Sequence, residues 1–257
     1  MIYMISRINK MVQRHCKGNS PKIITALWLL LLMANFAFGQ SKYPPRNEVH
    51  KDSSLTTFIC KLQYAIFKKD KDFLLSVVDT NIKNSFGGDD GIEEFKEMWN
   101  IDNPNSDIWF YLSKLISLGG VFYAYSDTIS PNGFLFPYVC AIELPDTLNV
   151  FTTMIVTATN VNVREKPDDT SKIVGQFNYD IVTVDYDKSY PEFEFEEGEK
   201  LKHVQYYGEK EWYYVSSLDK KICGYVHWEY IWGCVDYRLI LYKIDGIWKI
   251  TCLISGD

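Results

Sequence analysis

The stretch VNVREKPDDTSKIVG, residues 161–175, decides the fold of the central part of this chain. Val161 and Val163 alternate with polar residues, and such alternation predicts a strand with one buried face. A polar loop containing Pro167 follows, and then a short apolar strand closed by Gly175. Two aromatic runs lie downstream, EWYYV at 211–215 and GYVHWEYI at 224–231. We therefore expect a small β unit here.

These separated segments, in this order, resemble the bacterial SH3-like (SH3b) domain. The resemblance implies a small β-barrel over residues 152–235 that serves for binding or scaffolding. It implies no particular reaction, because one fold hosts many functions. The acidic and aromatic segment 187–199 departs from the pattern, and we expect a hairpin or a partner-contacting loop there. A calcium site is disfavoured because the segment lacks the signature of such a site, oxygen ligands at set spacings with a turn glycine between them.

The first 39 residues have the pattern of a signal peptide. Basic residues between Arg7 and Lys22 precede an apolar run, 23–38, that is shorter than the roughly 20 residues of a membrane span. Ala37 and Gly39 are the small residues that a signal peptidase requires ahead of Gln40. We expect cleavage there and a mature protein that is periplasmic or secreted by a Gram-negative cell. An uncleaved N-terminal anchor is the alternative.

Charge argues against two classes of partner. The first 39 residues hold five of the 27 Lys and Arg residues and none of the 33 acidic ones, so cleavage leaves a formal net charge of about −11. Such a surface repels nucleic-acid phosphates and anionic lipid head groups. We expect no nucleic-acid partner, and no membrane span after signal cleavage.

Five cysteines follow the signal: Cys60, Cys140, Cys223, Cys234 and Cys252. An oxidising compartment permits a disulfide, and Cys223 with Cys234 is the pair closest in sequence. The odd number argues against a dense disulfide framework. Since Cys60, Cys140 and Cys252 lie in apolar stretches, we expect them to be buried as small core residues.

Residues 52–150 are expected to form the first part of an α+β module, after a polar leader over residues 40–51. Apolar residues recur at helical spacing from Leu55 to Ile66, and we expect the Ser53-Ser54 pair to cap this helix. The glycine-rich segment 85–91 is expected to be a tight turn, because it lacks the Lys-Ser/Thr pair of a phosphate-binding loop. The patterns also predict helices over 72–78, 92–99 and 107–118, and strands over 134–143 and 151–157.

Two alternating runs, RLILYKI at 238–244 and IWKITCLI at 247–254, flank Asp245-Gly246. An Asp-Gly pair between such runs predicts a hairpin whose two turn residues have positive φ. An isolated hairpin is marginal in water, so residues 236–257 are expected to complete the α+β module. Helices that precede a strand of the type Y-K-x-D-G-x-W-K-I resemble the nuclear transport factor two-like superfamily. The resemblance implies a discontinuous, helix-covered sheet module with the SH3-like barrel inserted in it.

Motifs for catalysis are scarce. The chain after the signal has three histidines, and it has no zinc-peptidase, serine-hydrolase or C-x-x-C motif. A cysteine peptidase built on Cys60 is disfavoured because only His50 lies outside the SH3-like part as a base. The carboxylates Asp89, Asp90, Glu93 and Glu94 are better explained by a solvated helix N-terminus than by an acid/base pair. We expect no metal and no cofactor.

An aromatic set in the SH3-like part is the candidate ligand surface. Alternation places some of its rings in the core, whereas exposed Trp and Tyr rings offer rigid stacking area for peptides, sugars or proline-rich segments. Our first candidates are Trp212, Trp228 and Tyr230, followed by Tyr179 and Tyr213. The other members of the set are Tyr214 and Trp232.

The sequence is thus interpreted as that of an exported, non-enzymatic binding or scaffolding protein of the cell envelope, which contacts a cell-wall or protein ligand through the barrel. Two alternatives stay open. One is an envelope hydrolase with its pocket in the α+β module, since cone-shaped folds enclose pockets. The other is a purely structural protein without a ligand.

Overall fold

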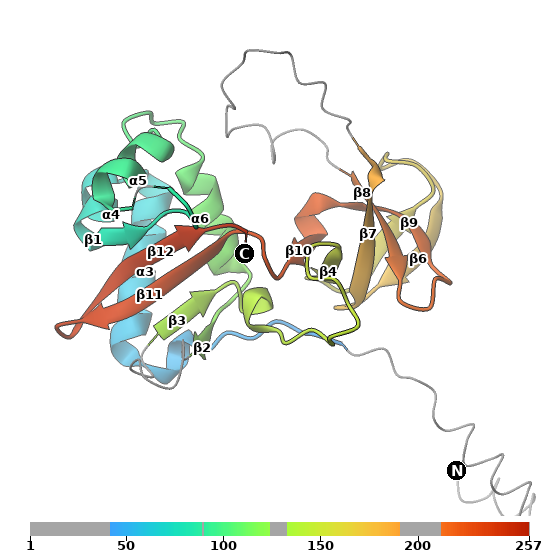
Figure 1. The fold of residues 1–257 in the computed structure, drawn as a ribbon, viewed down its shortest axis with the longest axis horizontal. Helices are drawn as coiled ribbons and strands as arrows, with labels where there is room; N and C mark the ends of the chain where they lie inside the picture. The colour runs from blue at the N-terminus through green and yellow to red at the C-terminus, as the bar shows by residue number, and fades with distance from the viewer. Residues whose placement is uncertain (1–41, 89, 124–132, 191–211, 257) are drawn as a thin grey trace, which may run out of the picture. The chain divides into compact units, whose positions relative to one another are not determined.

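The computed structural model describes residues 42–88, 90–123, 133–190 and 212–256. The fold is mixed α+β, and Ser41–Asp257 forms one compact unit with two β-sheets (Figure 1). The predicted signal peptide, and the acidic segment after Tyr190, lie outside the described residues.

The first sheet has the strand order β1-β12-β11-β3-β2. β12 pairs in parallel with β1, while β11 pairs antiparallel with both β12 and β3. The C-terminal hairpin therefore lies inside a sheet whose other strands all precede the strands of the second sheet in the chain. The strands are β1 (Val78–Lys83), β2 (Val121–Tyr123), β3 (Gly133–Phe136), β11 (Arg238–Ile244) and β12 (Ile247–Ile254).

Four α-helices of the described chain accompany this sheet, and none of them is long and apolar enough to cross a membrane. They are α3 (Ser53–Lys68), α4 (Lys71–Val77), α5 (Ile92–Met98) and α6 (Ile108–Ser117). The four predicted helices are present, with ends that differ by a few residues at most. A short 3-10 turn, η1 (Val49–Lys51), precedes them.

The cap of α3 differs from the expectation. Asp52, in an extended conformation, accepts a hydrogen bond from the Leu55 N–H at 2.9 Å, so it is the N-cap. Ser53 and Ser54 already belong to the helix. The predicted cap is wrong because Asp is as good a cap acceptor as Ser and precedes the serines in the chain.

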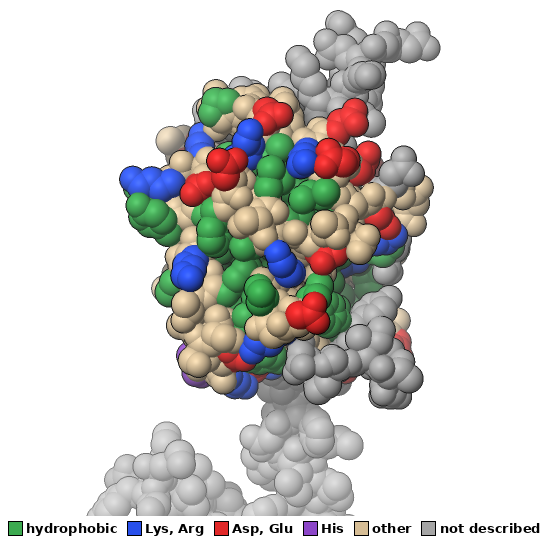
Figure 2. Space-filling model, turned by 90° about the vertical axis from the view of Figure 1, so that its left-hand side faces the viewer, with side chains coloured by type: hydrophobic (Ala, Val, Ile, Leu, Met, Phe, Trp, Pro, Cys, Tyr) green, Lys and Arg blue, Asp and Glu red, His purple; other side chains and the backbone are tan. Residues whose placement is uncertain are grey.

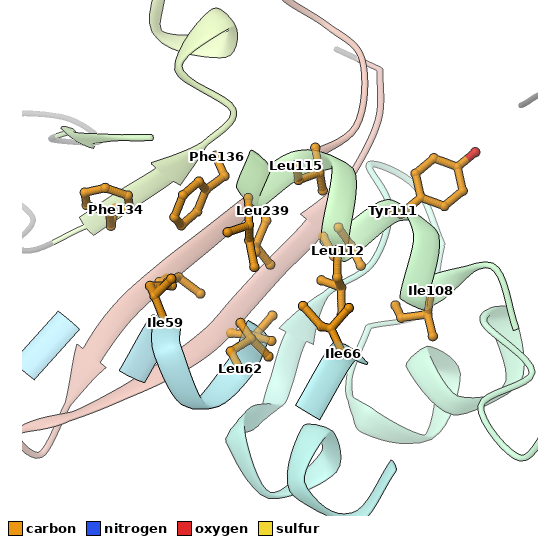
Figure 3. Packing of buried hydrophobic residues seen from close by; sticks show 14 of the residues in the cluster. Ile59, Leu62, Ile66, Ile108, Tyr111, Leu112, Leu115, Phe134, Phe136 and Leu239 are labelled. Atoms are coloured by element: carbon orange, nitrogen blue, oxygen red, sulfur yellow. The ribbon is translucent and has the colours of Figure 1, made fainter. Parts of the chain in front are cut away.

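The core of the first sheet is filled by α3 and α6 (Figure 3). Ile59, Leu62 and Ile66 recur at three- and four-residue spacing on α3 and pack with Leu112 of α6. Phe134 of β3 adds its ring to the same cluster. A helical stripe on each helix is thereby removed from water, which is the main stabilising contribution to this half of the fold.

The terminal hairpin is confirmed. Asp245 and Gly246 have φ values of 49° and 81°, as the two central residues of a type I′ turn require. Trp248 of β12 is buried to 4% exposure and its Nε1 donates to Ser54 Oγ at 3.0 Å. The hairpin is thus fixed both to the sheet and to α3.

The predicted strand 134–143 is wrong in its second half. β3 ends at Phe136, and a 3-10 turn, η2 (Tyr138–Ala141), follows Pro137. Proline has no N–H to donate to a strand ladder, so the pairing stops there although the residues that follow are apolar. Strand β1 was not expected, because Val78 continues the apolar pattern of α4 and only its pairing with Ile250 reveals a strand.

The second sheet has the strand order β10-β4-β7-β8-β9-β5-β6. It has two edges, β10 and β6, and the described strands do not close into the expected barrel. The sequence-predicted strand 151–157 is its strand β4. The strands are β4 (Thr153–Val156), β5 (Val161–Arg164), β6 (Ile173–Phe177), β7 (Ile181–Tyr190), β8 (Trp212–Ser217), β9 (Cys223–His227) and β10 (Ile231–Gly233), with a 3-10 turn, η3 (Trp228–Tyr230), between the last two.

Three strands of the second sheet contribute to two hydrophobic clusters. Met154 and Val156 of β4 belong to the cluster of the second sheet, whereas Ile155 between them belongs to the cluster of the first. Ile181 of β7 and Trp232 of β10 also belong to the first cluster, at 2% and 1% exposure. Successive strand residues point to opposite faces, so these three strands are buried on both sides.

The described part of the leader, from Lys42, lies against both sheets. Lys42 forms an ion pair with Asp180, which is buried before β7. The Tyr43 N–H donates to the Tyr179 carbonyl, and the Glu48 N–H donates to the Gly120 carbonyl, each at 2.8 Å. Residues 42–51 therefore act as a strap with specific contacts, rather than as a polar linker.

The cysteines are all unbridged in the described chain. Cys252 is buried as expected, and Cys140 is partly buried. The expectation for Cys60 is wrong, because this side chain is exposed on the outer side of α3. Phe58, Ile59 and Leu62 nearby are apolar and buried, but Cys60 lies outside the apolar stripe that these residues form on the helix.

Replacing Trp248 with Ala should lower the free energy of unfolding by about 3–5 kcal/mol, because a buried ring and its hydrogen bond are lost. Ile247→Ala, next to it but 62% exposed, should change stability by less than about 0.5 kcal/mol. Urea denaturation followed by circular dichroism measures both. Equal effects of the two substitutions would show that the hairpin does not pack on α3.

Asp52 should make stability depend on pH. The hydrogen bond from Ser54 Oγ, then that from the Leu55 N–H, lowers the pKa of Asp52 from 3.8 to about 2. Because the pKa is lower in the folded state, the ionised carboxylate stabilises the fold at pH values above the pKa of the unfolded state. This stabilisation is lost as the pH falls through about 2. Asp52→Asn keeps a cap acceptor but does not titrate, so wild type should be more stable by about 1 kcal/mol at pH 6.

That difference should fall by about half by pH 3, as measured by urea denaturation of both proteins. Asp146→Asn, at an exposed position, serves as the control. A difference between wild type and Asp52→Asn that stays constant from pH 6 to pH 3 would contradict the assignment of the cap.

Candidate functional site

A groove of about 300 Å³ lies on the second sheet, between the start of β5 and the end of β9. One side is formed by Trp212, His227 and Tyr230. The other side is polar and is formed by Thr159, Asn160, Asn162, Arg164 and Asp169, while Glu229 adds a second carboxylate and Val161 an apolar contact.

The aromatic side is a row of three rings. Trp212 and His227 are direct partners across β8 and β9, and their ring centroids lie 5.2 Å apart at an interplanar angle of 71°. The Tyr230 ring lies 6.3 Å from that of His227. Trp212 is only 5% exposed and Tyr230 is 43% exposed, so the row runs from a fixed ring to an accessible one. Edge-to-face contacts of this kind hold rings in place.

The polar side is held by hydrogen bonds within the sheet. Asn162 Oδ1 accepts from Gln176 Nε2 at 2.9 Å, which fixes the orientation of the Asn162 amide. Arg164 Nη1 donates to the Ser171 carbonyl at 2.7 Å, which restrains the guanidinium. The Asn160 N–H donates to Asn178 Oδ1 at 2.8 Å. These side chains have little conformational freedom to lose when a ligand binds, and this lowers the entropic cost of binding.

Charges of both signs line the groove. Arg164 is cationic, and Asp169 and Glu229 are anionic. Glu229 Oε2 lies 3.6 Å from His227 Nδ1. A groove with amides, both charges and rings suits a polar ligand that also has an apolar or stacking face.

Trp212 and Tyr230 were predicted to be outward-facing rings of the ligand site, and both line the groove. Only Tyr230 is exposed, because the Trp212 ring is buried at 5% exposure. Trp228 does not face outward as expected. It is 8% exposed, its ring lies 5.6 Å from that of Phe110 on α6, and Lys114 Nζ lies 5.6 Å from its ring centre. Trp228 thus contacts the first half of the chain, because η3 turns its side chain away from the groove.

Tyr179 and Tyr213 lie outside the groove. Tyr179 has φ of 58°. Its carbonyl accepts a hydrogen bond from the Tyr43 N–H, and its own N–H donates to the Ala158 carbonyl. Tyr213 follows Trp212 in β8, so it points to the other face and packs against the second hydrophobic cluster. The structure therefore brings two of the five candidates together.

The sequence analysis missed the polar side and His227. A usable signal was present, since Val161 and Val163 are buried and alternation then places Asn162 and Arg164 on the opposite face. His227 could not be found this way, because its pairing with Trp212 depends on the register of β8 and β9.

Two of the carboxylates that were considered as catalytic groups form ion pairs with lysines. Asp90 Oδ2 lies 2.6 Å from Lys83 Nζ, and this contact lowers the pKa of Asp90. Glu93 Oε1 lies 2.7 Å from Lys96 Nζ on the surface of α5. Asp89 lies outside the described residues, within which no group of three or more His, Cys, Asp or Glu residues could hold a metal ion.

Comparisons of this chain with protein-family models, with curated proteins and with solved structures gave no match. The groove must therefore be interpreted from its own geometry.

Proposed function

We propose that this protein is an exported, non-enzymatic binding protein of the Gram-negative cell envelope, and that the groove on its SH3-like second sheet contacts a cell-wall or protein ligand. The observation that supports the proposal most strongly is the row Trp212, His227 and Tyr230 opposite the restrained polar side chains of Asn162 and Arg164. The segments that resemble an SH3-like domain form β5, β6, β8 and β9, and three of these strands border the groove.

The first sheet is proposed to be a frame of the nuclear transport factor two-like type. Two observations support this role. Its helices cover a mixed sheet completed by the C-terminal hairpin. Its interior is filled by side chains at 0% exposure, such as Leu112, Leu115, Phe134 and Phe136. A filled interior favours a supporting role for this half over that of a hydrolase with a central pocket.

One face of the frame has the character of an ordinary solvated surface. Figure 2 shows the face on the side of α4 and β1, where hydrophobic, acidic and basic side chains are intermixed. Intermixed charges and single apolar side chains are ordinary for a solvated surface. The groove on the second sheet combines concavity with a row of rings, and this is why we place the ligand there.

Export is tested by the mass of the mature protein. We expect protein recovered from the periplasm or the medium to begin at or near Gln40, because the basic, apolar and small residues ahead of it fit a signal peptidase. Intact-mass spectrometry after cell fractionation measures this. Recovery of the full-length chain from the membrane fraction, with none in the periplasm or medium, would contradict export with cleavage.

Ligand binding is tested with purified peptidoglycan and purified envelope proteins. Tyr230→Ala should weaken binding by about 30-fold, equivalent to about 2 kcal/mol, because the accessible ring of the row is lost. Tyr64→Ala is the matched control, since this tyrosine is 64% exposed on α3 and lies outside the groove. Co-sedimentation and calorimetry of both variants give the affinities.

Trp212 is a poorer choice for substitution because its burial predicts a loss of stability of about 3–5 kcal/mol on replacement with Ala. Equal affinity of wild type and Tyr230→Ala would show that the groove is not the ligand site. A folded wild type that binds neither peptidoglycan nor any envelope protein would favour the purely structural alternative.

A further inference from the structure

Two cysteines lie where the chain leaves the first sheet and where it returns. Cys140 belongs to η2, directly after β3, and Cys234 follows β10, directly before β11. Cys140 Sγ lies 4.0 Å from the Gly233 carbonyl oxygen, and Cys234 Sγ lies 4.0 Å from the Ile142 carbonyl oxygen. Each thiol therefore contacts the backbone of the segment that carries the other.

All strands of the second sheet lie between these two cysteines in the chain. η2 and β10 are also neighbours in the fold, and both cysteines pack against the first hydrophobic cluster. A bond between their sulfur atoms would tie the entry and exit of the second sheet together.

We propose that Cys140 and Cys234 form a disulfide that closes the chain around the second sheet when the protein folds in an oxidising compartment. The two thiols lose two protons and two electrons as the S–S bond forms. A disulfide of glutathione, or of a thiol–disulfide oxidoreductase, accepts both and is reduced to two thiols. Formation of the bond in the cell depends on the export that we propose above. The assignment of Cys140 and Cys234 as the bonded pair depends only on the geometry.

The other cysteines are less well placed. Cys223 begins β9, and β8, β7 and β4 separate β9 from β10, so the pair closest in sequence is far apart in the sheet. Adjacent strands are about 4.8 Å apart, while the Cα atoms of a disulfide lie within about 7 Å. Cys60 is exposed on α3, and Cys252 of β12 pairs with Ile240 of β11.

Burial determines when this bond can form. It raises the pKa of both thiols, that of Cys234 to about 11, so little thiolate is present at neutral pH in the folded protein. Exchange should therefore be slow once the chain has folded and fast while the two segments are still accessible.

The test is oxidative refolding of residues 40–257, the chain after the predicted signal, which holds five cysteines. The protein is unfolded with reductant, refolded in reduced and oxidised glutathione, alkylated and analysed as peptides by mass spectrometry. We expect one linked pair, Cys140 with Cys234, while Cys60, Cys223 and Cys252 are alkylated. Cys140→Ser should abolish the bond and leave Cys234 alkylated, whereas Cys223→Ser should leave the bond intact.

Stability gives a second measurement. Closing a loop of this length should lower the population of unfolded molecules on the order of 1,000-fold, as seen in urea denaturation of the oxidised and reduced wild type. Oxidised and reduced preparations of Cys140→Ser should not differ in this way. A linked Cys223–Cys234 pair, or a folded protein with all five thiols alkylated, would overturn the proposal.

Trapping thiols in intact cells separates this proposal from that of export. A linked pair in cells supports both. Thiols that are reduced in cells, in a protein that forms the pair on refolding, would contradict an oxidising compartment and leave the pairing correct.

Discussion

The alternation of side chains in β4, β7 and β10 is the constraint on which the two halves of the fold depend. Ile155, Ile181 and Trp232 belong to the cluster of the first sheet, and their neighbours in the same strands belong to that of the second. Neither half can be removed without exposing one side of these strands to water. The second sheet is therefore an insertion in the sequence but not an independent body in its packing.

This constraint also explains how the groove is held. The ring row begins at Trp212, in the middle of the second sheet's strand order, and ends at Tyr230 in η3. The same turn contains Trp228, which contacts Phe110 of α6, and Lys114 Nζ donates to the Glu229 carbonyl at 2.7 Å. The residues that flank the groove are thus anchored to the first half of the chain. Sites built on such rigid elements lose little entropy on binding.

Patterns within one element could be read from the sequence, whereas pairings between distant elements could not. The Asp245-Gly246 turn and the stripe of α3 follow from local periodicity, and the structure confirms both. The stop of β3 at Pro137, and the parallel partner of β1, depend on which strand lies alongside. For the site, composition identified Trp212 and Tyr230, which line the groove, but also Trp228, which does not. The sequence does not show that η3 turns the Trp228 ring away from the groove.

The central claim is that the groove on the second sheet is the ligand site. Titration of ¹⁵N-labelled protein with soluble peptidoglycan fragments, or with a purified envelope partner that binds it, tests this claim through the indole N–H signals. The account predicts that the Trp212 signal shifts on saturation. The Trp248 signal should not shift, because Trp248 lies outside the groove and its indole N–H donates to Ser54 Oγ of α3. A saturable ligand that shifts Trp248 and leaves Trp212 unchanged would contradict the account.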